Sequence, residues 1–181
     1  VYNVGQTVSI SDQQLVLDIC NGEEPNGETD EEMMMYDYNG AVNGGSYYVF
    51  HIDMAASWWS PCFSYIGSMD KISAAWEMWY QDEYNVVNFT NLDDVGQPYS
   101  CQAWGNQGSL SDNLMTEDPG YNLFNDFNSS NGFPSNVFID HNMTVHWKGN
   151  NLSYYVANLR FDEMLEACED DPMANCNQCT D

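Results

Sequence analysis

Short stretches of hydrophobic and polar residues divide the chain into elements of both types. The clearest strand is predicted at residues 47–52, where aromatic and β-branched side chains follow one another as in a largely buried strand. The clearest helix is predicted at 61–80, where apolar side chains recur every three or four positions. The remaining pattern predicts strands at 15–19, 86–92 and 109–115, helices at 99–105, 119–128 and 151–168, and a β-hairpin over 133–147. This order predicts an α/β fold with a mixed central sheet flanked by helices, in which residues 46–90 form one right-handed βαβ unit.

The domain organisation follows from the same pattern. A chain of 181 residues fits one domain with a sizeable core. We place this domain at 45–168, after an N-terminal extension at 1–44 that packs on it and before an acidic tail at 169–181. Three consecutive methionines at 33–35 invite a soft-metal interpretation, but packing is favoured because consecutive side chains point in different directions.

The charge of the chain excludes several kinds of partner. The formal net charge is −25, and the three basic residues are Lys71, Lys148 and Arg160. Nucleic acids and anionic membrane surfaces are therefore excluded, because almost nothing could neutralise their phosphates. The sequence also lacks a run of about 18 apolar residues, so no membrane span is expected.

Cysteine content and sequons favour an oxidising compartment. The chain begins at Val1 and holds six cysteines, an even number. We therefore expect an extracellular or periplasmic protein from which a signal peptide has been removed. Four Asn-x-Ser/Thr sequons would permit glycosylation there, at Asn88, Asn128, Asn142 and Asn151.

The candidate site follows the central strand. Residues 58–62 read Trp-Trp-Ser-Pro-Cys and lead directly into the long predicted helix. This loop resembles that of the thioredoxin-like superfamily, which usually reads Trp-Cys-x-Pro-Cys. Trp58, Ser60, Pro61 and Cys62 fit the pattern, and Trp59 stands at the position of the first, attacking cysteine.

A second segment carries the rest of the resemblance. Residues 133–140 read Phe-Pro-Ser-Asn-Val-Phe-Ile-Asp. They resemble the element in which thioredoxin-like proteins place a cis-proline against the catalytic sulfurs, here Pro134. The phrase looks most like the redoxin branch, which includes exported thiol-disulfide proteins and peroxiredoxin relatives. The resemblance covers about residues 45–166 and implies a thioredoxin-like fold with a cis bond before Pro134.

The tryptophan changes the chemistry that the resemblance implies. In the family, the first cysteine is the attacking thiolate and the second resolves the mixed disulfide. Trp59 has no nucleophilic atom, so a two-cysteine shuttle through this loop is impossible. Three interpretations of Cys62 stay open: a small buried hydrophobe, a structural disulfide with Cys101 as the first partner to check, or a single reactive thiol resolved by Cys101.

The remaining cysteines are expected to be structural. Cys176 and Cys179 have the spacing of a redox or zinc pair. Zinc needs four ligands, so a local tail disulfide, or a bridge from the tail to Cys20 or Cys168, is favoured. We expect no cofactor and no specific metal site, although some of the 28 carboxylates could bind calcium weakly.

Two polar residues lie inside the central strand. His51 is expected to be buried, neutral and hydrogen-bonded to a neighbour. Asp53 follows it, where thioredoxin-like proteins often carry a buried acid or aromatic residue near the site.

These observations leave three hypotheses about function. The first is an acidic, exported binding or structural module that has lost dithiol catalysis and associates with a protein partner or with itself. Trp59 motivates it, because aromatic side chains suit interfaces. The second is a thiol-disulfide oxidoreductase that uses Cys62 with a second cysteine such as Cys101. The third is a metal-binding protein, suggested by the methionine run and the acidity.

Overall fold

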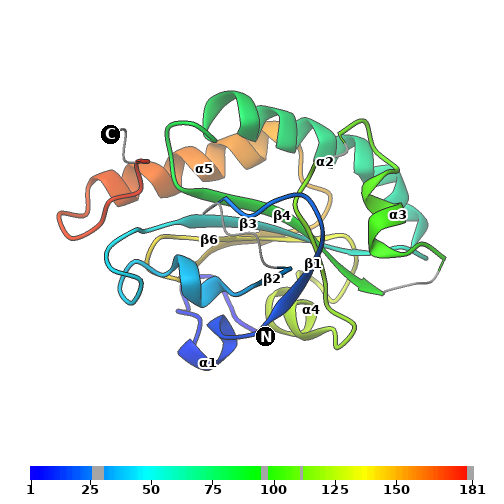
Figure 1. Ribbon diagram of the computed structural model, residues 1–181, viewed down its shortest axis with the longest axis horizontal. Helices are drawn as coiled ribbons and strands as arrows, with labels where there is room; N and C mark the ends of the chain where they lie inside the picture. Colours follow the sequence, from blue (N-terminus) through cyan, green and yellow to red (C-terminus); the bar gives the residue numbers. More distant parts are fainter. Residues whose placement is uncertain (26–30, 95–97, 111, 179–181) are drawn as a thin grey trace.

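The computed structural model describes residues 1–25, 31–94, 98–110 and 112–178, and these form one mixed seven-stranded sheet flanked by helices (Figure 1). The strand order is β2-β1-β5-β4-β3-β6-β7. The strands are β1 (Leu17–Asn21), β2 (Glu32–Met33), β3 (Val49–Ala56), β4 (Val86–Asp94), β5 (Met115–Glu117), β6 (Ser135–Ile139) and β7 (Val145–Gly149). The helices are α1 (Ile10–Gln13), η1 (Met35–Tyr38), α2 (Ser60–Trp79), α3 (Cys101–Gly105), α4 (Asn122–Phe127) and α5 (Tyr154–Glu169).

Strand β3 is the centre of the sheet. Every residue of β3 is buried, and the strand pairs in parallel with β4 and antiparallel with β6. Helix α2 connects β3 to β4, so residues 46–90 form the predicted β-α-β unit. The mixed sheet flanked by helices is confirmed.

The core lies on both faces of the sheet. Helices α2 and α5 lie together over one face, and α1 and α4 lie on the other (Figure 1). Phe161 and Met164 of α5 are fully buried against the first face, and Phe127 of α4 is fully buried against the second. The sheet therefore separates two apolar layers, which is the arrangement that the alternation of buried strand residues requires.

The first 44 residues add to the sheet and the core. Strand β1 pairs antiparallel with β5 and with β2. Met33 and Met35 are buried in the main hydrophobic cluster together with Leu17. The methionine run therefore packs in the core, as the favoured interpretation expected.

Several element boundaries differ from the prediction, and two of these differences have a clear local reason. The strand predicted at 109–115 begins only at Met115, because the backbone N–H and hydroxyl of Ser109 donate hydrogen bonds to Asp70 of α2 instead of to a neighbouring strand. Helix α5 begins at Tyr154 rather than at 151, because Asn151 has a left-handed backbone with φ of 51°. Among the helices in the described part of the chain, none is long and apolar enough to cross a membrane.

Candidate functional site

Trp59 is the residue from which helix α2 starts. Strand β3 ends at Ala56, and the Trp59 N–H donates to the Ala56 carbonyl at 3.1 Å, which closes a tight turn. Trp59 is the N-cap of α2, with Pro61 in the first helical turn, where proline needs no hydrogen-bond acceptor. The indole Nε1–H donates to the carbonyl oxygen of Phe133 at 3.0 Å.

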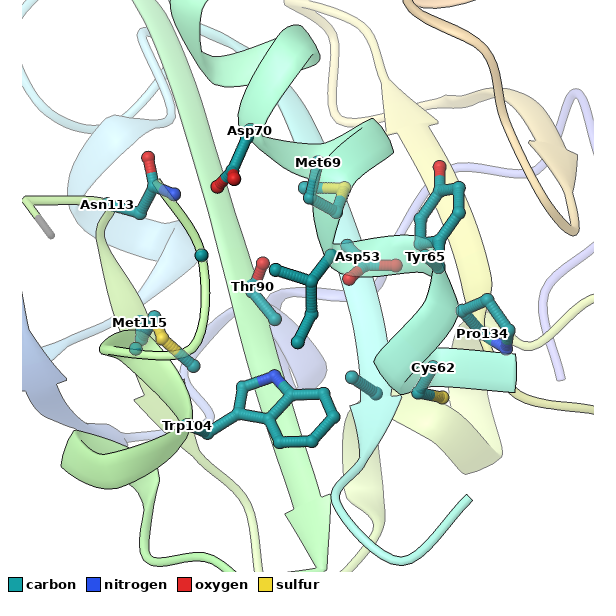
Figure 2. Close-up of a pocket in the computed structure, with 14 residues that line it drawn as sticks. Asp53, Cys62, Tyr65, Met69, Asp70, Thr90, Trp104, Asn113, Met115 and Pro134 are labelled. Atoms are coloured by element: carbon teal, nitrogen blue, oxygen red, sulfur yellow. The ribbon is translucent and has the colours of Figure 1, made fainter. Parts of the chain in front are cut away.

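The Trp59–Phe133 contact brings two distant segments together. The Phe133–Pro134 peptide bond is cis, as the resemblance implies. Pro134 lies beside Cys62 and Tyr65 in the wall of a small cavity (Figure 2). The two segments that carried the resemblance therefore meet at one end of β3.

Cys62 is a buried thiol. Its side chain is 2% exposed, and its Sγ accepts a long hydrogen bond from the Ala56 N–H at 3.5 Å. Burial raises the pKa of the Cys62 thiol to about 12, and the nearby carboxyl groups of Asp53 and Asp93 act in the same direction. Because the thiolate is the reactive form, Cys62 has almost no nucleophilic character near neutral pH.

The cavity next to Cys62 is narrow and contains a buried acid. Its volume is about 30 Å³, which is room for a water molecule. Asp53, Thr90 and Trp104 are among the residues that line it (Figure 2). Asp53 is 2% exposed, and its Oδ1 has no hydrogen-bond partner within the described residues. Burial raises the pKa of Asp53 to about 8, so this carboxyl group is mainly protonated at neutral pH.

A second buried acid, Asp93, was missed by the sequence analysis. Asp93 is fully buried at the end of β4, where a loop was predicted. Burial and the nearby Asp118 carboxyl group raise the pKa of Asp93 to about 9. Asp118 accepts hydrogen bonds from the Leu123 N–H and the Asn122 amide, which fixes the start of α4. The sequence did contain one indication of this acid: Asp93 lies near the carboxyl end of a predicted strand, and the carboxyl ends of parallel strands commonly form sites in α/β folds.

The prediction that His51 is buried, neutral and hydrogen-bonded is confirmed. It is fully buried, and its two ring nitrogens lie at hydrogen-bond distance from the side-chain amides of Asn88, at 2.7 Å, and Asn136, at 2.8 Å. Burial lowers the pKa of His51, so the ring is neutral. It holds β3, β4 and β6 in register and faces no thiol.

Of the three interpretations of Cys62 left open by the sequence, the disulfide with Cys101 is wrong. Cys101 pairs with Cys20, which joins α3 to β1, and Cys62 is a free thiol. The reason lies in the order of the strands. Strand β1, from the N-terminal extension, joins the sheet beside β5 and contacts α3, so Cys20 is the cysteine next to Cys101.

The tail is closed by a second disulfide. Cys176 pairs with Cys168 at the end of α5, one of the bridges proposed from the sequence. Because the two sulfurs are bonded to each other, neither Cys168 nor Cys176 can bind zinc as a thiolate. Cys179 lies outside the described residues.

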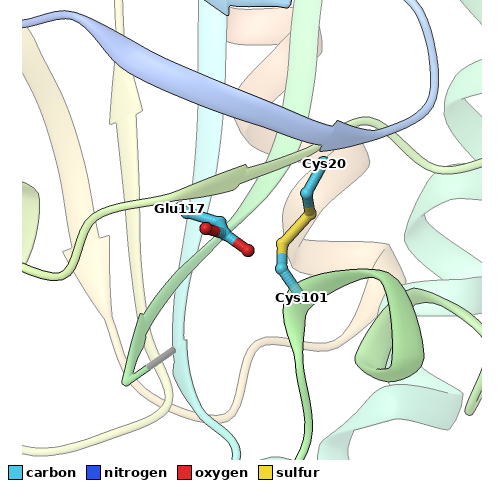
Figure 3. Close-up of side chains that lie close together, drawn as sticks. All are labelled: Cys20, Cys101 and Glu117. Carbon is cyan, nitrogen blue, oxygen red and sulfur yellow. A yellow bond between two sulfur atoms is a disulfide. The ribbon is translucent and has the colours of Figure 1, made fainter. Parts of the chain in front are cut away.

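Three side chains of types that can bind metal ions lie together at the first disulfide. A carboxylate oxygen of Glu117 and the sulfurs of Cys20 and Cys101 lie within 4.8 Å of one another (Figure 3). The two sulfurs are bonded to each other and offer no thiolate, so this group does not fit a metal ion.

The four sequons differ in exposure. Asn142 and Asn151 are exposed, and a glycan could be attached at either. Asn128 is buried, and its amide donates to the Phe124 carbonyl. Asn88 is wrong as a glycosylation candidate. Its side chain is buried in β4 and hydrogen-bonded to His51 and Ser73, which leaves no space for a sugar.

Solved structures of thiol-disulfide oxidoreductases share this architecture. A proposed protein disulfide isomerase from Bacteroides thetaiotaomicron superposes with a TM-score of 0.64 at 14% identity, covering 92% of each chain. A secreted disulfide oxidoreductase of Mycobacterium tuberculosis superposes with a TM-score of 0.56 at 14% identity, covering 86% of this chain and 99% of its own. An exposed lipoprotein thioredoxin of Streptococcus pneumoniae gives 0.54 at 16% identity, covering 81% and 98%.

The structural matches define the class of fold. The chain has a thioredoxin-like fold with a Cys-containing C-terminal tail, and its structural neighbours are thioredoxin-like thiol-disulfide proteins. No family model and no curated protein sequence matches the chain.

Proposed function

We propose that this protein is an acidic, exported thioredoxin-fold binding module that has lost dithiol catalysis. The observation that carries the proposal is the state of Cys62, which is the free cysteine of the described residues and is buried with a pKa of about 12. Trp59 supports the proposal because it is the N-cap of α2, in the loop that resembles the thioredoxin-like site. An indole there can bind but cannot attack a disulfide.

Export is supported by the cysteines and by the neighbours. Two disulfides join residues of the described chain, and such bonds persist in oxidising compartments. Two of the solved structures are described as a secreted protein and as an exposed lipoprotein. We assign this protein to the extracellular or periplasmic space on these grounds.

The alternative function is thiol-disulfide exchange by Cys62. One observation favours it: Cys62 lies in the same apolar cluster as Cys101 and Cys20. The Cys62 thiolate would attack Cys101 Sγ, form a Cys62–Cys101 bond and release Cys20 as a thiolate. The raised pKa of Cys62 opposes the first step, because it requires the thiolate.

Two measurements on the native protein decide between these functions. In an insulin-reduction assay we expect no turnover above background, with an active thioredoxin as the positive control. In a thiol titration we expect Cys62 to react only after the protein is unfolded. Turnover that disappears in Cys62→Ser would overturn the proposal and establish the alternative.

A further inference from the structure

Exposed aromatic side chains surround the start of helix α2. Trp58, Trp59 and Phe63 are 52%, 43% and 47% exposed. The two indoles contact each other with ring centroids 5.6 Å apart, and Phe63 lies one helical turn after Trp59. We name Trp58, Trp59 and Phe63 the aromatic surface. Such a concentration of exposed rings marks an interaction site.

Side chains of neighbouring segments contact the aromatic surface. Phe63 contacts the rings of Tyr99 and Trp104, at centroid distances of 6.2 and 6.0 Å. On the other side, Trp58 donates a side-chain hydrogen bond to Tyr121. The rings are therefore presented on a rigid support, which lowers the entropic cost of binding.

One carboxylate, that of Asp94, lies near Tyr121, the residue that Trp58 contacts. Asp94 is partly exposed and pairs with Ala56, and its carbonyl accepts a hydrogen bond from Ser57, the residue before Trp58.

The three basic side chains of the chain lie elsewhere. Lys148 donates to the Tyr2 carbonyl, and Arg160 pairs with Glu163. Lys71 is on α2, about 18 Å along the helix axis from Trp59. A cationic ligand at the aromatic surface would thus meet negative charge and no repulsion from these groups.

We propose that the aromatic surface binds a lysine- or arginine-bearing segment of a partner protein, with its cations over Trp58 and Trp59 and beside Asp94. The proposal rests on the proposed function, because it gives the binding module its ligand. Indole rings attract ammonium and guanidinium groups more strongly than other aromatic rings do. The chain already contains such a contact, with the Arg160 guanidinium 5.8 Å from the Trp147 ring centroid.

Charge distinguishes this partner from the other candidates. A second copy of this chain would bring another net charge of −25 against the same face. A neutral sugar would use the rings but gain nothing from the charge of Asp94. A cationic segment is the ligand that uses both features.

The test measures binding of a fluorescent hexalysine peptide, with hexaglutamine as the neutral peptide and an N-acetylglucosamine hexamer as the sugar. We expect hexalysine to bind and the other two not to bind. Trp58→Ala and Trp59→Ala should each weaken hexalysine binding about three- to tenfold. Trp79→Ala is the matched control, because Trp79 is exposed at the opposite end of the same helix.

A second pair of variants separates local binding from general attraction to an acidic protein. Asp94→Asn should weaken hexalysine binding, whereas Asp82→Asn, which removes one charge from an exposed position elsewhere, should not. This pair keeps the proposal testable if a tryptophan variant fails to fold.

Three results would overturn the inference: equal effects of Trp59→Ala and Trp79→Ala, equal effects of Asp94→Asn and Asp82→Asn, or binding of the sugar in preference to hexalysine. The proposed function fails differently, through insulin turnover that depends on Cys62. The two failures can therefore be told apart.

Discussion

The indole Nε1–H of Trp59 donates a hydrogen bond to the backbone carbonyl of Phe133, 3.0 Å away. The bond spans 74 positions of sequence and joins the start of α2 to the residue before cis-Pro134. The contribution of this contact to stability, and the chemistry of position 59, can both be tested.

Trp59→Phe should destabilise the protein modestly. Phenylalanine keeps an aromatic ring but cannot donate to the Phe133 carbonyl, and loss of one such bond costs about 1 kcal/mol. Urea unfolding measures the change. Trp79→Phe, at an exposed position on the same helix, should change the free energy of unfolding by less than about 0.5 kcal/mol. Equal effects of the two variants would mean that the Trp59 bond does not contribute to stability.

Trp59→Cys should create disulfide-reductase activity. A cysteine at the N-cap of α2 would have its pKa lowered by the helix N-terminus, and Cys62 would stand three residues later to resolve the mixed disulfide. Insulin reduction with dithiothreitol as the reductant measures the gain. Trp58→Cys is the matched control and should stay inactive, because residue 58 precedes the cap. If Trp59→Cys is as inactive as Trp58→Cys, then Trp59 does not hold the position of the attacking residue.

Stability should fall as the pH rises from about 4 toward 8, in part because of two buried acids. The pKa values of Asp53 and Asp93 are about 8 and about 9 in the folded protein, and an unfolded aspartate titrates near 3.9. The folded state therefore holds more protons in this window, and each group can lower the free energy of unfolding by up to about 1.4 kcal/mol per pH unit.

Asp53→Asn tests this pH dependence, because asparagine cannot ionise. Its unfolding free energy, measured in urea at pH 6, 7 and 8, should fall less steeply than that of the unchanged protein. Asp93→Asn should have a similar effect that extends to higher pH. An unchanged slope in both variants would show that these carboxyl groups do not hold protons in the folded state.

The two disulfides should contribute unequally to stability. Cys20–Cys101 closes a sequence separation of 81, and Cys168–Cys176 closes a separation of 8. Loop-closure entropy predicts a loss of about 4.5 kcal/mol for the first pair and about 2.5 kcal/mol for the second when both cysteines become alanine. Thermal unfolding of the two double variants compares them directly. A larger loss for the short tail loop would contradict the entropic account.

The sequence alone determined the class of fold and the location of the candidate site. Strand β3 is a run of buried-type side chains, and α2 has a long apolar repeat, so local preference and tertiary structure agree there. Trp59, Pro61 and Pro134 could be recognised because each lies in a short segment with a local pattern. The placement of His51 was also predictable, since a polar ring inside a buried strand must find polar partners.

Only the tertiary structure decided which cysteines pair and which acids are buried. Cys20 reaches Cys101 because β1 joins the sheet beside β5, and no local pattern in the sequence fixes the order of outer strands. Asp93 was missed because polar residues near the end of a strand are read as a loop until the helix that covers them, α4, is placed. Burial and disulfide pairing depend on contacts between distant segments, and local side-chain preferences carry little information about those contacts.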